Sequence, residues 1–242
     1  MYLLLMRHGE TDWNLEGRMQ GRIDTPLNAR GREQAKKLAE RLAAEECIDV
    51  LYTSPLARAR LTAEIIGKRF GLEPLPDVRL VERSAGKLEG MTMPEIEQRY
   101  PDVYCAWRED KDRLLLPDAE DKAEFQLRVL SFLELIRDRH SHQQVGVVTH
   151  GGTLSILFAT LMGLDIQKRF PFRFDNAALS KVDFSRRRPR IDLLNDSCHL
   201  RAIGTESRSV ECEEPLTEIP GPVITSTGLV TQLSPLIGDG IA

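Results

Sequence analysis

Apolar residues along 1–200 occur in two patterns, as short continuous runs and as positions three or four residues apart. Short apolar runs at 1–7, 49–52 and 145–148 end in charged or small residues, as buried strands do where they open into loops. Segments 28–46 and 122–139 instead place apolar residues three or four positions apart, with charges between them, which is typical of amphipathic helices. A further helix is predicted over 54–70, with Ser54 as N-cap, Pro55 at the first helical position and Gly71 as the stop.

The remaining elements complete an alternating order. Short helices are predicted at 94–100 and 103–111, a mostly apolar helix at 151–163, and late strands at 178–184 and 191–194, while strand signals over 73–81 are weak. Strands that alternate with helices predict an α/β fold. The expected architecture is a three-layer sandwich with a mostly parallel central sheet flanked by helices.

The chain changes character near residue 201. Residues 201–242 contain no lysine and no aromatic residue, but four prolines, five glycines and six acidic residues. Such a segment has little to bury, so it is expected to be a loosely ordered C-terminal tail outside a domain at 1–200.

Charge narrows the range of partners. The chain has 242 residues, 33 basic and 37 acidic, for a net charge of −4, and the excess acid lies in the tail. Residues 1–200 therefore have as many acidic as basic residues, which argues against a nucleic acid as the main partner, because such binders carry a basic surface. Small anionic molecules stay compatible, since a pocket can be basic on a neutral protein.

Cysteine usage and hydropathy give expectations about the compartment. Four cysteines (47, 105, 198 and 212) are scattered without a C-x-x-C pair, which disfavours a disulfide framework and favours a cytoplasmic protein. The apolar run 2–6 is too short for a signal segment, and prolines interrupt the uncharged stretch 219–238, so no membrane association is expected. The oligomeric state stays open, with a homodimer as one option.

Two strand–loop–helix junctions each place a histidine just after a predicted strand: His8 within R-H-G-E and His150 within T-H-G-G. A third junction delivers Arg58 in the first turn of a helix. In open α/β sheets ligands bind at this edge, so if the three strands are neighbours, Arg7, His8, Arg58 and His150 converge on one pocket. The helix that begins at Gly151 adds a positive dipole end.

Each piece alone has an ordinary structural interpretation. A single histidine at a strand end is more often a hydrogen-bonding structural residue than a catalyst, and Arg58 alone would be a surface residue of a helix. His140 and His142 are better explained as a solvated helix end than as a metal site. No metal or other cofactor is expected, and neither a P-loop nor a cysteine-phosphatase loop occurs.

The chain resembles the histidine phosphatase superfamily, in the branch related to cofactor-dependent phosphoglycerate mutase. Residues 5–14 read L-M-R-H-G-E-T-D-W-N, and this opening is followed by further matches in the order and spacing of the family. They are Gln20-Gly21, Asp24-x-Pro26-Leu27, Gly31-x-x-Gln34-Ala35, Ser54-Pro55-Leu56-x-Arg58-Ala59, Leu80-x-Glu82-x-x-x-Gly86-x-x-Glu89-Gly90 and Thr149-His150-Gly151-Gly152.

The resemblance covers about residues 1–198 and implies a phosphoglycerate-mutase-like fold with a catalytic domain over 1–200. It implies that His8 is the nucleophile that becomes phosphohistidine, and that Glu82 protonates the leaving oxygen. Arg7, Arg58 and His150 would hold the phosphoryl oxygens with help from Asn14, while Gln20, Gly21 and Gly151 would lie in the substrate site. Residues 84–125 would form a substrate cap.

Three functions are compatible with this resemblance. The first and favoured one is a metal-independent phosphatase that hydrolyses small phosphate monoesters, because Glu82-Arg83-Ser84-Ala85-Gly86 departs from the aromatic-glycine pair that follows Glu-Arg in mutases. The second is a mutase that returns the phosphoryl group to another hydroxyl. The third is a non-catalytic phospho-ligand module, which would not need His8, Glu82 and His150 together.

Overall fold

The computed structural model describes residues 1–108, 118–168, 170–186 and 188–201. Residues Met1–Gly204 belong to one compact unit. Almost all of the predicted tail, the end of the predicted helix 103–111 and part of the predicted cap 84–125 lie outside the described residues.

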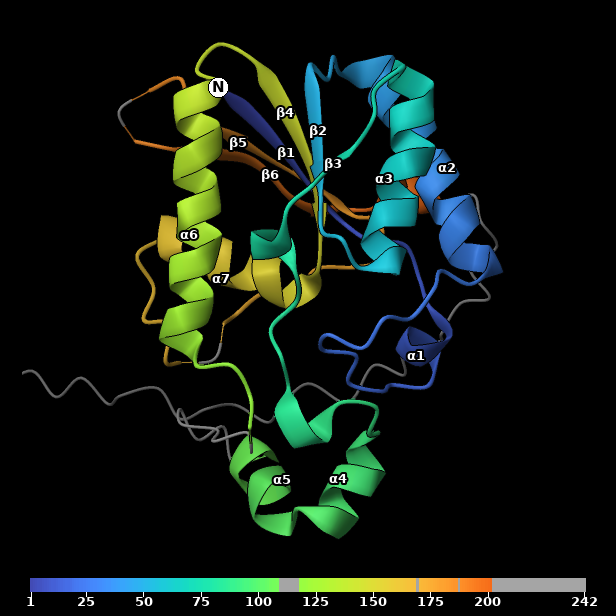
Figure 1. The fold of residues 1–242 in the computed structure, drawn as a ribbon, viewed down its shortest axis with the longest axis vertical. Coiled ribbons are helices and arrows are strands. Elements are labelled where there is room, and N and C mark those ends of the chain that lie inside the picture. Colours follow the sequence, from blue (N-terminus) through green and yellow to red (C-terminus); the bar gives the residue numbers. More distant parts are fainter. Residues whose placement is uncertain (109–117, 169, 187, 202–242) are drawn as a thin grey trace, which may run out of the picture. The chain divides into compact units, whose positions relative to one another are not determined.

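A six-stranded sheet forms the centre of this unit (Figure 1). Its strands are β1 (Tyr2–Arg7), β2 (Val50–Thr53), β3 (Leu75–Pro76), β4 (Gln144–Thr149), β5 (Leu179–Asp183) and β6 (Arg190–Asp196), in the order β3-β2-β4-β1-β5-β6. The three pairings among β3, β2, β4 and β1 are parallel, whereas β5 and β6 add two antiparallel pairings at one side. The predicted sheet is therefore confirmed as an α/β core, and it is mixed.

Helices cover both faces of the sheet. They are α1 (Asp12–Leu15), α2 (Ala29–Glu45), α3 (Ala57–Phe70), α4 (Met93–Arg99), α5 (Pro101–Arg108), α6 (Lys122–Arg139) and α7 (Gly151–Leu161). Figure 1 shows α2 and α3 on one side of the strands and α6 and α7 on the other. This is the three-layer arrangement that the sequence predicts.

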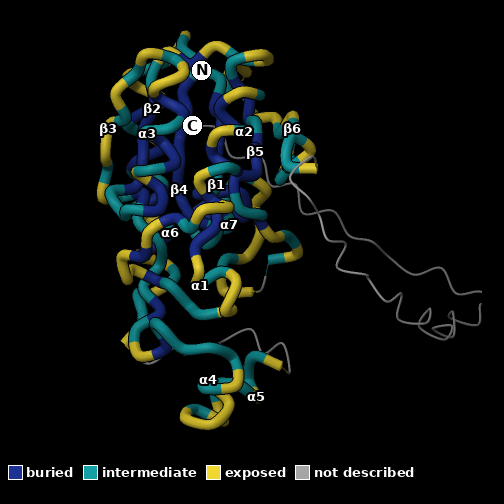
Figure 2. Tube along the Cα trace, turned by 90° about the vertical axis from the view of Figure 1, so that its right-hand side faces the viewer, coloured by how far each residue is buried: buried dark blue, intermediate teal, exposed yellow. Residues whose placement is uncertain are grey.

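The side-chain alternation of β1 explains why both faces are covered. Leu3 and Leu5 pack into the apolar cluster beneath α6 and α7, while Leu4 and Met6 pack into the cluster beneath α2 and α3. A strand whose successive side chains are all buried needs a layer on each side. Figure 2 shows β1, β2, β4 and β5 as mostly buried, and α4 and α5 as more exposed.

The helix after β2 starts later than predicted. It begins at Ala57 with Leu56 as the N-cap residue and no side-chain cap, and Gly71 ends it in a left-handed conformation at φ 67°, as predicted. Ser54 is therefore not the N-cap; its hydroxyl accepts the Leu56 N–H and lies 2.8 Å from His150 Nε2. The Ser-Pro pattern predicts a cap, because nothing near it in the chain indicates that the Ser54 hydroxyl contacts His150, 96 positions away.

A short helix at the site was not predicted. The helix α1 is only four residues long and is fixed by a capping box, in which Thr11 Oγ1 accepts the Asn14 N–H and Asn14 Oδ1 accepts the Thr11 N–H. So short an element has no apolar periodicity to reveal it. Among the described residues, no helix combines the length and apolar character needed to cross a membrane.

Candidate active site

The three junctions singled out in the sequence meet at one edge of the sheet. The strands β2, β4 and β1 are consecutive neighbours, and all three run in parallel, so their carboxyl ends lie side by side. Thr53 pairs with Val148, and Arg7 pairs with Thr149, which brings the residues that follow each strand together. The rings of His8 and His150 are 5.2 Å apart between centroids.

The ring of His8 is held in one tautomer. Its Nδ1 lies 2.6 Å from the carbonyl oxygen of Gly9, and since a carbonyl only accepts, Nδ1 carries the proton and donates it. The other ring nitrogen, Nε2, is then unprotonated and available as a nucleophile. Burial, Arg7 and Arg58 hold the pKa of His8 well below the usual 6.5, which keeps the ring neutral at physiological pH.

His150 is fully buried, and its contacts favour the same Nδ1-protonated tautomer as in His8. The Ser54 hydroxyl accepts from the Leu56 N–H, so its own proton is free to be donated to His150 Nε2. Nδ1 then carries the ring proton and, among the described residues, has no hydrogen-bond partner. Burial and Arg58 also hold the pKa of His150 well below 6.5. The ring is thus a neutral donor to a ligand.

Arg58 is buried and Arg7 is half-buried, and neither has a carboxylate partner in the described part of the chain. Arg58, 1% exposed, donates from Nη1 to the Ile23 carbonyl and from Nη2 to the Gly21 carbonyl, each at 2.8 Å. Arg7 donates to the Phe174 carbonyl at 2.6 Å. Burial lowers the pKa of Arg58 to about 10, so it stays charged at neutral pH. Neither guanidinium forms a direct ion pair among the described residues, and the Glu82 carboxylate attracts both only at longer range, so the pocket favours an anion.

Hydrogen-bond donors remain free at this spot. Among the buried side-chain atoms that the structure describes, those without a hydrogen-bond partner are Nε of Arg7, Nε of Arg58 and Nδ1 of His150. Buried donors are normally satisfied, so three unpaired ones on neighbouring junctions indicate a ligand with several acceptor oxygens. A phosphoryl group has this chemistry, and arginine binds it with a planar fork of donors.

Glu82 contacts the first turn of α7. Its Oε2 accepts the Gly152 N–H at 2.8 Å, and its Oε1 accepts the Arg83 N–H at 2.8 Å. A Cβ added at Gly152 would meet Glu82 Oε1 at 2.3 Å, so the absence of a side chain there makes room for the carboxyl group. At Gly151 the same added atom would lie 3.6 Å from Arg7 Nε, in ordinary contact. Of the two glycines in the T-H-G-G motif, only Gly152 is therefore required by its surroundings, because it makes room for Glu82.

A cavity of about 280 Å³ connects these groups, which suits a small ligand. Twelve residues line it: Arg7, His8, Asn14, Arg18, Met19, Gln20, Gly21, Arg58, Glu82, Arg83, Ser84 and Ala85. Of the predicted site residues, His150 and Gly151 are not among the lining residues, although His150 faces His8 and Gly151 lies beside Arg7. Gln20 lines the cavity while its Oε1 accepts the Thr25 hydroxyl.

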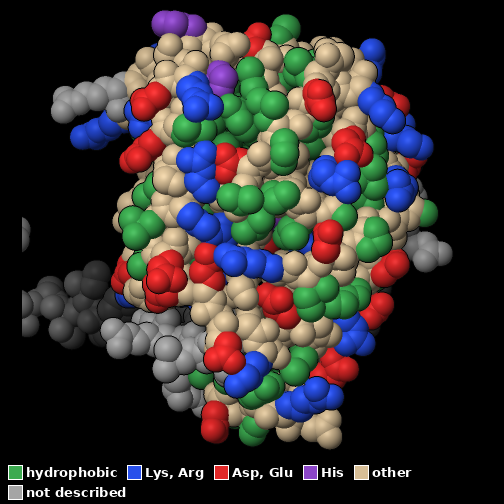
Figure 3. Space-filling view, in the orientation of Figure 1, with side chains coloured by type: hydrophobic (Ala, Val, Ile, Leu, Met, Phe, Trp, Pro, Cys, Tyr) green, Lys and Arg blue, Asp and Glu red, His purple; other side chains and the backbone are tan. Residues whose placement is uncertain are grey.

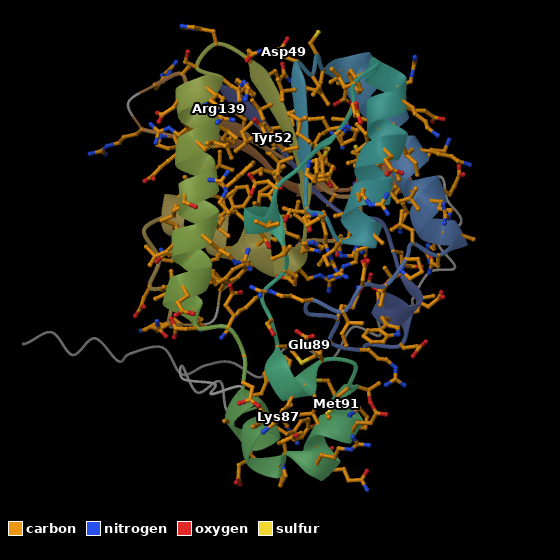
Figure 4. The ribbon with its side chains drawn as sticks, viewed as in Figure 1. Asp49, Tyr52, Lys87, Glu89, Met91 and Arg139 are labelled. Carbon is orange, nitrogen blue, oxygen red and sulfur yellow. The ribbon has the colours of Figure 1, made fainter. Side chains whose placement is uncertain are left out.

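Glu89 and Glu120 fix the loops around the cavity, a role that no local sequence pattern predicts. Glu89 Oε1 accepts from the Arg22 and Ala85 N–H groups and from the Ser84 hydroxyl, which ties two lining segments together. Figure 4 labels Glu89 between the sheet and the segment of α4 and α5. Glu120 forms two hydrogen bonds with the guanidinium of Arg128 and one with Arg22, so it does not add free negative charge to the rim. Local sequence gave no signal for these long-range partners.

Asn176 is a third residue at the site that the sequence pattern does not reveal. It precedes β5, outside the three junctions, and its Nδ2 lies 3.1 Å from the His8 carbonyl and 3.2 Å from Asn14 Oδ1. A lone asparagine before an antiparallel strand has no local pattern that would separate it from a turn residue.

The structure gives no support to a metal at His140 or His142. His140 Nε2 lies 2.9 Å from the Tyr52 hydroxyl, and its Nδ1 donates to Gln143 Oε1 at 2.7 Å. Within the described ranges, no group of three or more histidine, cysteine, aspartate or glutamate side chains could hold a metal ion.

Figure 3 shows basic side chains interspersed with acidic ones over one face.

The chain matches a known protein family over most of its length. Residues 3–197 match the family model described as histidine phosphatase superfamily (branch 1). Phosphoserine phosphatase 1 of Hydrogenobacter thermophilus is 39% identical over 82% of this chain and 93% of that protein. Metal-independent phosphoserine phosphatase of Arabidopsis thaliana is 34% identical over 86% of this chain and 87% of its own length. Probable phosphoglycerate mutase GpmB of Escherichia coli is 35% identical over 76% and 85%.

Solved structures of other proteins share the fold of this chain. Bacillus stearothermophilus YhfR has a TM-score of 0.75 and 32% identity, covering 82% of this chain and 98% of that one. A histidine-to-alanine mutant of the phosphoserine phosphatase of Entamoeba histolytica, solved in complex with phosphoserine, has a TM-score of 0.72 and 25% identity with the same coverage.

Proposed function

The chain belongs to branch 1 of the histidine phosphatase superfamily, and from this premise we propose that it hydrolyses a small phosphate monoester that also carries a carboxylate, as phosphoserine does. It is a phosphatase that acts through a phosphohistidine and needs no metal ion, as its family and its phosphatase-named relatives establish. What is proposed is the role of each residue, and the class of ester.

In the proposed first step, the lone pair of His8 Nε2 attacks phosphorus as the ester P–O bond breaks. Glu82, in its protonated form, gives its proton to the leaving alkoxide, which is too basic to depart unaided. Arg7, Arg58 and the Nδ1–H of His150 stabilise the three equatorial oxygens, because phosphoryl transfer depends mainly on positioning and charge. The supporting observation is the set of three unpaired buried donors at this spot.

In the second step a water molecule attacks the phosphohistidine. The Glu82 carboxylate takes a proton from that water as the new P–O bond forms and the N–P bond breaks, which restores neutral His8 and releases inorganic phosphate. The same carboxyl group thus acts as acid and then as base, which requires it to lie beside the leaving and entering oxygen. Its contact with the first turn of α7 and its place in the cavity wall support this role.

The charge of the cavity wall supports a second anionic group in the substrate. Two arginines besides Arg7 and Arg58 line the cavity. Arg18 forms ion pairs with Glu16 at 2.6 Å and Glu95 at 2.9 Å, so its charge is compensated. The Arg83 side chain donates from Nε to the Glu120 carbonyl at 2.9 Å, and no carboxylate oxygen of the described residues lies within 4 Å of it.

Burial lowers the pKa of Arg83, with partial opposition from Glu120, Asp121 and Glu82 at longer range. A half-buried guanidinium that lacks a carboxylate partner is stabilised by an anion from the substrate. We therefore assign Arg83 to the substrate carboxylate.

The test is a comparison of phosphoserine with phosphoethanolamine, which lacks the carboxylate, measured as phosphate release in the presence of a chelator. We expect kcat/KM to be at least about tenfold higher for phosphoserine, because a charged hydrogen bond contributes roughly 1.5–3 kcal/mol. The variant Arg83→Gln should remove this preference and leave phosphoethanolamine turnover nearly unchanged.

Arg18→Gln is the matched control, since Arg18 lines the same cavity but is already paired. It should retain the preference. If Arg83→Gln keeps the preference for phosphoserine, the carboxylate is bound elsewhere; if neither substrate is hydrolysed while an aryl phosphate is, the proposed ester class is wrong.

A mutase remains the alternative to weigh, because one matching relative is named a probable phosphoglycerate mutase. It predicts turnover that depends on a bisphosphoglycerate primer and yields an isomer without free phosphate. A non-catalytic module predicts binding of phosphoserine without release of phosphate. Measuring phosphate and isomer in one assay separates all three.

A further inference from the structure

Asn176 contacts three parts of the site at once. Its Nδ2 lies 3.1 Å from the His8 carbonyl oxygen, 3.3 Å from the Gly9 carbonyl oxygen and 3.2 Å from Asn14 Oδ1. The Gly9 carbonyl is also the acceptor that fixes the His8 ring through Nδ1. One amide group therefore contacts both the carbonyl that selects the tautomer of His8 and the side chain of Asn14.

The backbone around Asn176 is fixed independently of its side chain. The Ala177 N–H donates to the carbonyls of both Arg7 and His8, at 3.2 and 3.1 Å, and Arg7 donates to the Phe174 carbonyl. On the far side, Asn195 Oδ1 accepts the Asp175 N–H at 2.7 Å. Replacing the Asn176 side chain should therefore remove its donor without displacing the loop.

The contact with Asn176 fixes the orientation of the Asn14 side-chain amide. Asn14 Oδ1 accepts from the Thr11 N–H, the Thr11 hydroxyl and Asn176 Nδ2, so all its donors come from the protein. Asn14 lines the cavity. With the oxygen engaged on the protein side, the Nδ2 donor of Asn14 is the end left for a phosphoryl oxygen.

We propose that Asn176 is a positioning residue for phosphoryl transfer, which orients the His8 nucleophile through the Gly9 carbonyl and the Asn14 amide through its Oδ1. The inference rests on the proposed roles of His8 and Asn14. Asn176 acts as a hydrogen-bond donor, so a side chain of the same shape that cannot donate should not replace it. Aspartate in this place would direct carboxylate oxygens at two carbonyl oxygens and the Asn14 Oδ1, all of which are acceptors.

The experiment measures the single-turnover rate of forming the acid-labile phosphoenzyme from an aryl phosphate in Asn176→Ala and Asn176→Asp. We expect a loss of roughly 10–100-fold in Asn176→Ala, because a displacement of about 1 Å at a reacting group costs up to ~10² in rate. Asn176→Asp should lose at least as much, although it preserves the shape of asparagine. A packing role predicts the opposite order, with Asn176→Asp close to wild type.

Asn195→Ala is the matched control, because Asn195 supports the same loop through Asp175 and makes no contact with His8 or Asn14 in the structure. It should lower the melting temperature without slowing phosphoenzyme formation. Combining Asn14→Ala with Asn176→Ala should lower the rate by less than the product of the two separate losses, since both substitutions disrupt the same hydrogen-bonded arrangement.

Wild-type rates in Asn176→Asp, or fully multiplicative losses in the double variant, would overturn the inference. His8→Ala, measured in parallel, tests the proposed function separately. If His8→Ala forms no phosphoenzyme while both Asn176 variants behave as wild type, only the positioning role is wrong. If His8→Ala still forms it, the proposed function itself fails.

Discussion

Adding one methyl group at Gly152 should separate the acid step from the rest of the chemistry. The Cβ of Gly152→Ala would lie 2.3 Å from Glu82 Oε1 and 3.0 Å from Glu82 Cδ, whereas ordinary contact begins near 3.4 Å. The carboxyl group must therefore retreat by about 1 Å. Since this is the end of a flexible side chain, the fold should survive, and alanine in place of glycine within a helix favours it by up to about 1 kcal/mol.

The expected loss follows from what the acid contributes. General acid catalysis is worth about 10²–10⁴ in rate, and a displacement of about 1 Å can remove some 10² of it. We expect kcat/KM for phosphoserine to fall about a hundredfold. An aryl phosphate should lose less than tenfold, because a phenolate leaves with little help from an acid. Glu82→Gln should show the same contrast between the two substrates.

Gly151→Ala is the matched control, because its added Cβ would lie 3.6 Å from the nearest atom, Arg7 Nε. It should retain turnover of both substrates within a few-fold. Thermal melting of each variant checks that the fold is intact. Equal losses on alkyl and aryl esters in Gly152→Ala, or no loss on either, would refute the assignment of Glu82 as the proton donor.

Three further outcomes are expected. Arg58→Ala should lower kcat/KM at least about a hundredfold on any ester, in keeping with the ~10³–10⁵ that a transition-state arginine can supply; a smaller loss in a steady-state assay would mean that it does not hold the phosphoryl group. Because the pKa values of His8 and His150 are held well below 6.5 in the folded state, the unfolded chain takes up protons first as the pH falls, so stability should decrease below about pH 6.5. Urea denaturation at pH 7.5 and 5.5 checks this, at up to ~1.4 kcal/mol per pH unit for each ring, and His8→Asn should reduce the slope; an unchanged slope would show that His8 does not titrate this way. Asn28→Ala should cost about 1 kcal/mol of unfolding free energy, since Asn28 Oδ1 caps α2 through the Gly31 N–H at 2.8 Å, and a change below 0.3 kcal/mol would contradict that role.

Helix and strand positions could be predicted well where the signal was local. The helix Lys122–Arg139 has the predicted bounds, and β1, β2 and β4 lie within a residue or two of their apolar runs. Ser54 shows where local reading failed. Ser-Pro is a common start of a helix, but its hydroxyl is used by His150, and no pattern within a few residues of Ser54 contains that information.

The sequence by itself determined the alternation of strands and helices and the identity of the reactive groups at three strand ends, because apolar spacing and short motifs are properties of neighbouring residues. Only the tertiary structure decided which groups face one another. It selected the Gly9 carbonyl as the acceptor for His8, brought Asn176 against Asn14, and paired Arg18 with carboxylates while leaving Arg83 without one. The reason is that hydrogen-bond partners and charge compensation depend on distances in space between residues remote in the chain, whereas periodicity depends on position along it.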